Sequence, residues 1–166
     1  MFDLFRRKPK PKTRLPSDDE TKAEIANTIA DLLRLQLMLL PPEYDGIDDD
    51  RGIIFRKSIG SVYGYIDSIL TTMGYDMGDN DVGIPITFHV LRKLFPNGRA
   101  ERYVEFLMYN MNDEKVVLGM MHGGQQWLDY GRPESKGVAM GLFQFILEDR
   151  AAQAAPGDVA ACETSR

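Results

Sequence analysis

The sequence predicts an all-α protein, a compact bundle of five or six helices built from residues 17–150. Two observations support this fold class. Apolar residues recur at intervals of three and four along most of the chain, which is the period of an amphipathic α-helix, and proline or glycine separates these stretches. The length of 166 residues and the hydrophobic content of 43% suit one domain with one core. We expect a flexible basic arm before the bundle, residues 1–16, and a disordered tail after it, residues 151–166.

The first helix is predicted to begin at Ser17, which forms a capping box with Glu20, and to end near Leu40, before two consecutive prolines. Its inner face is expected to consist of Ile25, Ile29, Leu32, Leu33 and Leu39. Toward its end, apolar side chains surround the helix, which indicates burial on several sides or a surface used by a partner. Leu35 and Met38 are therefore candidate interface residues.

Two acidic segments, residues 41–50 and 74–83, are predicted to be connectors between helices. Their carboxylates and glycines do not follow the spacing of a calcium-binding EF-hand loop. We expect both segments to be solvated, with Asp49 or Asp50 capping the helix that follows the first of them.

The helix over residues 51–75 is expected to lie at the centre of the bundle. Its apolar stripe has spacings of 4-3-4-3-4 and consists of Phe55, Ile59, Val62, Ile66, Ile69 and Met73. Gly60 and Gly64 lie together on the opposite face. A glycine within a helix costs about 1 kcal/mol relative to alanine, so a pair four residues apart predicts a close crossing by another backbone. Glycines tolerated on a solvent-exposed face are the alternative.

Residues 84–95 are compatible with two structures. They form either a helix opened by Pro85 or one strand of a β-hairpin whose turn contains Asn97 and Gly98. The helix is favoured, because residues 100–111 continue with a regular helical stripe of apolar side chains.

The last third of the chain is predicted to contain two or three further helices. Asp113 caps a short helix over residues 114–121, and the sequence His-Gly-Gly at 122–124 is expected to end it. Residues 125–130 make another turn or two. Pro133 then opens a helix that runs to about Arg150.

Four glycine pairs at i, i+4 occur, at 60/64, 74/78, 119/123 and 137/141, of which 74/78 is expected to lie in a loop. We expect close packing of helices at the first and the last of these pairs, within the chain or across a symmetric dimer. The predicted interface residues are Gly60, Gly64, Gly137, Gly141, Leu35 and Met38.

The charge distribution restricts the partners. The net charge is −5, but residues 1–14 carry +5 and the remaining 152 residues carry −10, so we expect no nucleic-acid partner. The aromatic and basic residues of the arm predict contact with an anionic membrane surface or an acidic partner, and a solvated leader is the alternative. These residues are Phe2, Phe5, Arg6, Arg7 and Lys8. A single cysteine, no secretory signal and no membrane-spanning apolar run predict a cytoplasmic protein, peripheral to a membrane at most.

Residues suited to catalysis or metal binding are scarce. The two histidines, His89 and His122, are not at a metal-binding spacing, and neither a phosphate-binding loop nor a nucleophile motif occurs. We therefore expect no catalytic residue, metal or cofactor. The favoured function is non-enzymatic: binding of a protein partner, or self-association, as an accessory or regulatory subunit.

The alternative function is that of a small-molecule-binding protein or small enzyme. Its site would consist of His122, Gln125, Trp127 and Tyr130, because a histidine beside two glycines combines a titratable group with exposed N–H donors. A capping role for His122 at a helix end, with Gly123 as the left-handed cap, explains the same residues without a ligand.

Overall fold

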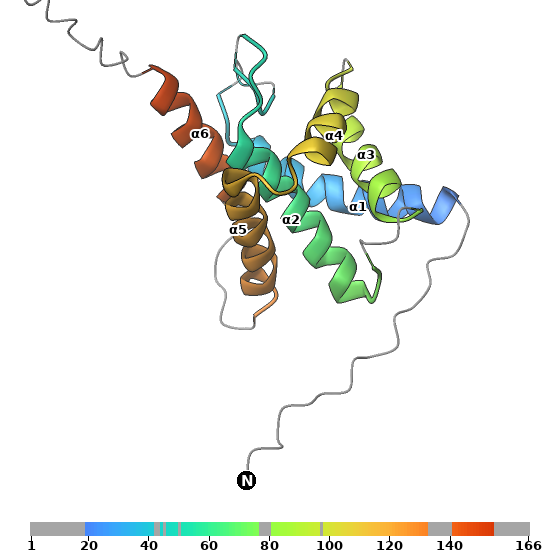
Figure 1. Cartoon of the computed structure of the whole chain (residues 1–166). Helices are drawn as coiled ribbons and strands as arrows, with labels where there is room; N and C mark the ends of the chain where they lie inside the picture. The colour runs from blue at the N-terminus through green and yellow to red at the C-terminus, as the bar shows by residue number, and fades with distance from the viewer. Residues whose placement is uncertain are drawn as a thin grey trace, which may run out of the picture.

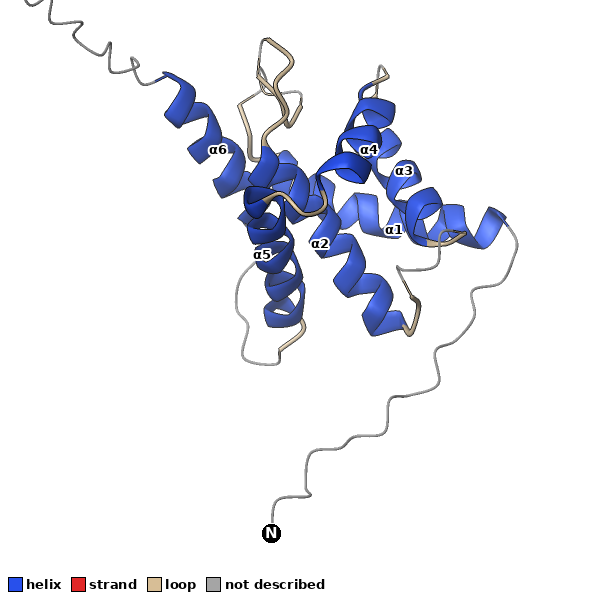
Figure 2. Ribbon diagram, viewed as in Figure 1, coloured by secondary structure: helices blue, strands red, loops and turns tan. Residues whose placement is uncertain are grey.

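The protein is described by a computed structural model for residues 19–41, 44, 46–49, 51–76, 81–96, 98–132 and 141–154. Within these ranges it consists of six helices and connecting loops, with no β-strand (Figure 2). The helices are α1 (Asp19–Leu37), α2 (Arg56–Met73), α3 (Gly83–Leu94), α4 (Arg99–Asn110), α5 (Glu114–Tyr130) and α6 (Gly141–Ala154). The predicted all-α bundle is confirmed.

Helix α2 lies at the centre of the bundle and contacts each of the other five helices. In Figure 1, α5 and α6 lie on one side of α2, α3 and α4 lie on the other, and α1 passes behind. The predicted stripe of α2 forms the middle of the core, since Ile59, Val62 and Ile66 are fully buried. The stripe ends before Met73, whose side chain is 47% exposed.

The start of α2 differs from the prediction. The residue before the helix is Phe55, and no side chain caps the helix there. Asp49 instead accepts hydrogen bonds from the backbone N–H of Ile53, at 2.7 Å, and of Arg51, at 3.0 Å, inside the preceding loop. The prediction that Asp49 caps α2 is therefore wrong, because the loop uses this carboxylate to hold its own turn; Asp50 lies outside the described residues.

Helix α1 ends at Leu37, about one turn earlier than expected. Ile29 and Leu33 are buried as predicted, whereas Leu39 is 51% exposed, because it follows the end of the helix and no longer keeps its register. Ser17, the predicted cap, lies outside the described residues.

The segment over residues 84–95 is helical, so the hairpin alternative is wrong. Val90 and Leu91 of α3 are fully buried, as is Tyr103 of α4. Helix α3 packs against both α1 and α4. A helical stripe buries more of these apolar side chains than the poorly alternating strand pattern of the same residues allows.

Helix α5 is continuous through His122, Gly123 and Gly124, where the sequence predicted a break. The positive φ angles among the described glycines occur at other positions, so Gly123 is not a left-handed cap. The predicted cap at the start of α5 is confirmed: Asp113 accepts hydrogen bonds from the N–H groups of Lys115, at 3.0 Å, and Val116, at 3.2 Å.

Helix α6 is described from Gly141 and continues to Ala154, four residues beyond the predicted end near Arg150. The side chains of Leu142 and Ile146 are buried and attach α6 to the core. Pro133, the predicted start of this helix, lies outside the described residues.

Candidate functional site: the outer face of α5

The crossing of α2 and α5 is a contact between two backbones. A Cβ atom added at any of four glycines would overlap a carbonyl group of the facing helix. The glycines and the residues whose carbonyls they meet are Gly60 with Val116, Gly64 with Met120, Gly119 with Lys57, and Gly123 with Ser61. The close crossing predicted for α2 is present, and α5 of the same chain occupies it.

This crossing determines which side of α5 faces outward. Because Gly119 and Gly123 face α2, the opposite side of the helix is exposed. Its residues are Glu114, Leu118, Met121, Gln125, Leu128 and Arg132, again with spacings of 4-3-4-3-4. We call these six residues the α5 outer face. Leu118, Met121 and Leu128 are 40%, 67% and 53% exposed, which is unusual for aliphatic side chains aligned on one helix.

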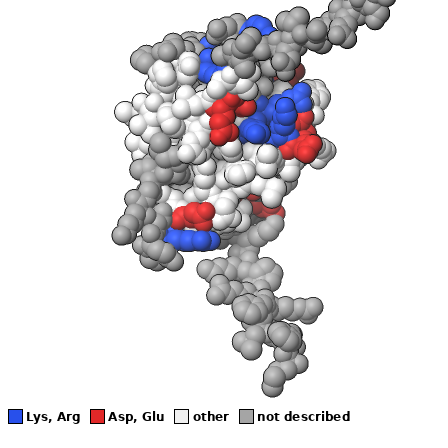
Figure 3. Space-filling model, turned by 90° about the vertical axis from the view of Figure 1, so that its left-hand side faces the viewer, with Lys and Arg blue, Asp and Glu red and all other residues white. Residues whose placement is uncertain are grey.

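The α5 outer face has apolar residues in its middle and charges at its ends. A spacing of alternating threes and fours is the seam of a helix that pairs with another helix. Gln125 donates a hydrogen bond to Asp129, at 2.9 Å, and Arg132 forms an ion pair with the same carboxylate, at 3.3 Å. Figure 3 shows the side of the molecule on which α5 and α6 lie in Figure 1, and uncharged residues make up much of the described surface there.

The structure divides the predicted interface residues between the interior and the surface. Gly60, Gly64 and Gly141 are buried within the chain, and Gly137 lies outside the described residues. A side chain at Gly141 would overlap that of Gln126. Of the predicted interface residues that are described, Leu35 and Met38 lie at the surface, with 53% and 73% exposure.

The predicted small-molecule site is not assembled. Trp127 and Tyr130 do lie together, as expected, with ring centroids 6.1 Å apart. Trp127 also donates a hydrogen bond to Thr72 of α2, at 3.1 Å. The exposed His122 contacts Phe145 of α6 instead, at 5.3 Å between ring centroids.

The axial distance between His122 and Tyr130 explains why they do not converge. Eight residues separate them, and eight residues of α-helix span about 12 Å. Trp127 turns toward α2 and His122 toward α6, so one small ligand does not reach both.

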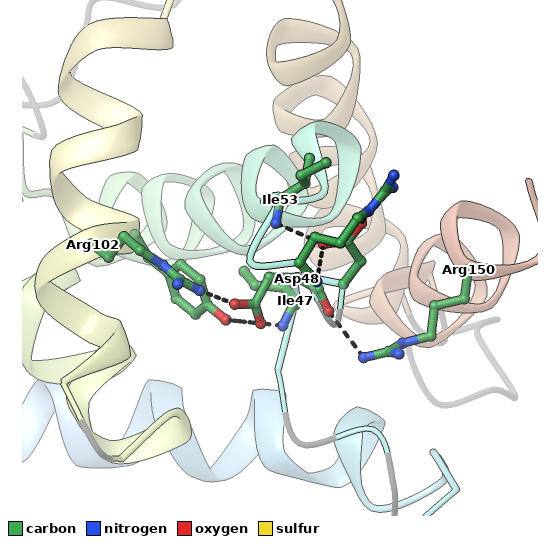
Figure 4. Close-up of polar contacts among 8 residues, drawn as sticks. Ile47, Asp48, Ile53, Arg102 and Arg150 are labelled. Atoms are coloured by element: carbon green, nitrogen blue, oxygen red, sulfur yellow. Dashed lines mark hydrogen bonds and ion pairs between the residues drawn. The ribbon is translucent and has the colours of Figure 1, made fainter. Parts of the chain in front are cut away.

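A buried polar centre around Asp48 was not predicted (Figure 4). This carboxylate is 7% exposed, pairs with Arg102, and accepts a hydrogen bond from the hydroxyl of Tyr103 at 2.7 Å. The same hydroxyl accepts a bond from the N–H of Ile47, at 3.2 Å. Arg150 of α6 donates to the carbonyl oxygen of Asp48, at 3.0 Å.

The Asp48 centre joins the loop before α2 to α4 and α6. The prediction of a solvated connector over residues 41–50 is therefore wrong, because Asp48 takes its partners from two helices far along the chain. Burial raises the pKa of Tyr103, against the lowering effect of its bond from Ile47 and of the nearby Arg99 and Arg102. Tyr103 thus remains a neutral donor, and the centre is a structural anchor in which the Tyr103 hydroxyl and the Asp48 carboxylate both have hydrogen-bond partners. Nothing in the sequence distinguishes Asp48 from its acidic neighbours.

Three further findings concern metal binding, membrane-spanning helices and the N-terminal arm. Among the described residues, no group of three or more His, Cys, Asp or Glu side chains is placed to hold a metal ion. Every helix of the described ranges is too short or too polar to span a lipid bilayer. The predicted membrane-contact residues, Phe2, Phe5, Arg6, Arg7 and Lys8, lie outside the described residues.

Fold and site together define the class as an all-α bundle with an exposed helical seam. Comparison of the chain with protein-family models, curated proteins and solved structures finds no match.

Proposed function

We propose that this protein is a non-enzymatic interaction module that pairs with a second copy of itself through the α5 outer face. The observation that supports the proposal is the exposed apolar seam of Leu118, Met121 and Leu128 on a helix whose other side is fixed against α2. Pairing would remove these side chains from water, which contributes about 25 cal/mol for each Å² of apolar surface buried.

The charges favour an antiparallel, two-fold arrangement. When two α5 helices run in opposite directions, Glu114 of one copy faces Arg132 of the second copy, and Leu118 faces Leu128. A parallel pair would place Glu114 against Glu114 and Arg132 against Arg132. Because like charges oppose association and opposite charges favour it, the antiparallel pair is preferred, and its interface uses the same patch on both copies.

The mass of the full chain in solution tests this proposal. We expect a concentration-dependent dimer by sedimentation velocity, and we expect Leu118→Glu to make it monomeric by placing a charge in the apolar seam. Met38→Glu is the matched control. It changes a side chain that is 73% exposed but lies outside the α5 outer face, so this variant should remain dimeric. Helical circular dichroism of both variants shows that they are folded.

Charge reversal provides the sharper experiment. Glu114→Lys or Arg132→Glu alone should weaken the dimer, and the two changes together should restore it, because the opposed pair is re-formed with its signs exchanged. A wild-type monomer at every concentration, or a dimer that Leu118→Glu leaves intact, contradicts pairing through α5.

A different protein partner is the second candidate, and it rests on the exposed apolar end of α1. Leu35 lies in the last turn of α1, Met38 and Leu39 follow directly after the helix, and each of the three is more than half exposed. If Met38→Glu, and not Leu118→Glu, dissociates a complex, the interaction belongs to α1 and the protein acts as an accessory subunit of another protein.

A further inference from the structure

A cavity of about 210 Å³ lies between α2, α3 and α4, away from the α5 outer face. It is lined by Tyr63, Ile84, Thr87, Val104, Leu107, Met108 and Met111. Apolar side chains form most of this wall. An apolar cavity of roughly 150 Å³ is large enough to admit benzene, so this one has room for a single small ring with a substituent.

One polar atom in the wall, the hydroxyl oxygen of Thr87, forms no hydrogen bond with the described residues. Thr87 is 3% exposed, and its buried Oγ1 has no hydrogen-bond partner among the described residues. A buried hydroxyl without a partner is unfavourable, so a ligand group that forms a hydrogen bond with it gains affinity in addition to its apolar contacts. Thr87 therefore provides a polar position without a partner in a cavity whose wall is mostly apolar.

The charge of a suitable ligand follows from the residues around the cavity. None of the lining residues is charged at neutral pH, because burial and the nearby Asp67 raise the pKa of Tyr63 above its ordinary value and keep its hydroxyl protonated. A charged molecule would lose its hydration without gaining a partner of opposite charge. Asp67, which lies one turn from Tyr63, would oppose an anion further.

The most exposed residues of the cavity wall are a methionine, Met108, and an isoleucine, Ile84. Met108 is 62% exposed and Ile84 is 41% exposed, whereas Thr87 and Leu107 are buried. Methionine side chains are unbranched and flexible, so they accommodate ligands of different outline.

We propose that this cavity binds a small uncharged molecule, an aromatic or aliphatic alcohol or phenol, with its hydroxyl on Thr87 Oγ1 and its apolar part against the α4 side chains. The proposal is independent of pairing through α5, because the two surfaces share no residue.

Phenol, benzene and benzoate are the probes, added to the full chain with ¹³C-labelled methionine methyl groups. Phenol should shift the signals of Met108 and Met111 and leave that of Met121, on the α5 outer face, unchanged. Benzene should bind more weakly than phenol, since it lacks the hydroxyl, and benzoate should not bind.

Two variants locate the site. Thr87→Val keeps the shape of the side chain and should reduce phenol affinity about fivefold, which corresponds to one net hydrogen bond, while leaving benzene affinity as it was. Val104→Trp should fill the cavity and abolish binding of both probes, with its melting transition as the check on folding. If neither probe shifts Met108 and Met111, if Thr87→Val lowers benzene and phenol binding equally, or if benzoate binds as well as phenol, the proposal is wrong.

Discussion

Gly64 in α2 lies against the backbone carbonyl of Met120 in α5, with no room for a Cβ atom between them. The two helices therefore approach as closely as their backbones allow. Gly123 of α5 meets the carbonyl of Ser61 in the same way, so each helix provides both a glycine and a carbonyl to the crossing. Such reciprocity fixes the rotation of α5 about its own axis, and with it the residues that face outward.

We expect Gly64→Ala to lower the free energy of unfolding by about 2 kcal/mol, although alanine is the better helix former. The added methyl group meets backbone, which cannot rotate away, so the helices must separate. Chemical denaturation measures the change. Gly131→Ala is the control, because its φ is −74° and the nearest atoms to an added Cβ are 3.7 and 3.8 Å away. Equal effects of the two substitutions would contradict the close crossing.

Asp48→Ala should cost about 2–4 kcal/mol of stability. It leaves the buried hydroxyl of Tyr103 without its acceptor and removes the ion pair of Arg102, a side chain that is itself 45% exposed. Asp31→Ala is the matched control, since its ion pair with Arg34 is largely exposed, and it should change stability by less than about 0.5 kcal/mol. Thermal unfolding of the two variants under the same conditions compares them, and similar losses would mean that Asp48 is not an anchor.

The cap of α5 should make stability depend on pH. Burial acts to raise the pKa of Asp113, but bonds from Val116 and Lys115 and the charge of Arg56 outweigh it and hold this pKa below 3.8. A lowered carboxyl pKa contributes stability that is present above pH 3.8 and is lost as the pH falls through the folded-state value. Asp113→Asn keeps a capping side chain without the charge, so the melting temperatures of wild type and variant should converge as the pH falls. A constant difference between them would show that the charge does not contribute.

Asp149 should have the opposite pH dependence. Burial raises its pKa above 3.8, and Glu148 adds to this effect, whereas a hydrogen bond from Ser58 and the charges of Lys57 and Lys115 compensate only in part. The folded protein therefore prefers the protonated carboxyl, and stability is lost as the pH rises through the raised value. Asp149→Asn should melt higher than the wild type at neutral pH and equal to it in acid. A variant that melts lower than wild type at neutral pH would contradict this assignment.

The basic arm remains a prediction from sequence. With a net charge of +5 over residues 1–14, it should bind vesicles of anionic lipid in a salt-sensitive way and should not bind neutral vesicles. Deletion of residues 1–14 should abolish the binding measured by vesicle co-sedimentation. Unchanged binding after the deletion would assign any membrane contact to another part of the chain.

Regular apolar stripes made most of the fold predictable. Most of the α2 stripe is confirmed, as are Ala100, Tyr103 and Leu107 of α4, because these side chains are buried in the core at the period of a helix; Met73 and Met108 are exposed instead. The break expected at Gly123 is wrong. Glycine has a low intrinsic helix propensity, but at this position it allows α5 to pack against the backbone of α2, a helix distant in sequence, and this packing stabilises the continuous helix. Sequence periodicity does not report which distant backbone will approach.

The candidate surface was missed for the same reason. With a break assumed at residue 122, Leu118 and Leu128 belong to different helices and no seam is visible. A continuous α5 aligns both residues with Met121, and the spacing then becomes a signal. The cavity at Thr87 had no sequence signal, because a threonine within a helix usually bonds to the preceding turn or to water.

The protein has one tryptophan, Trp127, and it lies where α5 meets α2. Its ring is edge-on to that of Tyr65, with 5.7 Å between the ring centroids. Its fluorescence therefore comes from a single position at the crossing of the two helices. If α5 separates from α2 before the rest of the bundle unfolds, the emission will shift to longer wavelength while helical circular dichroism is still retained. The unmodified chain thus carries its own optical probe of whether the glycine-lined crossing opens independently.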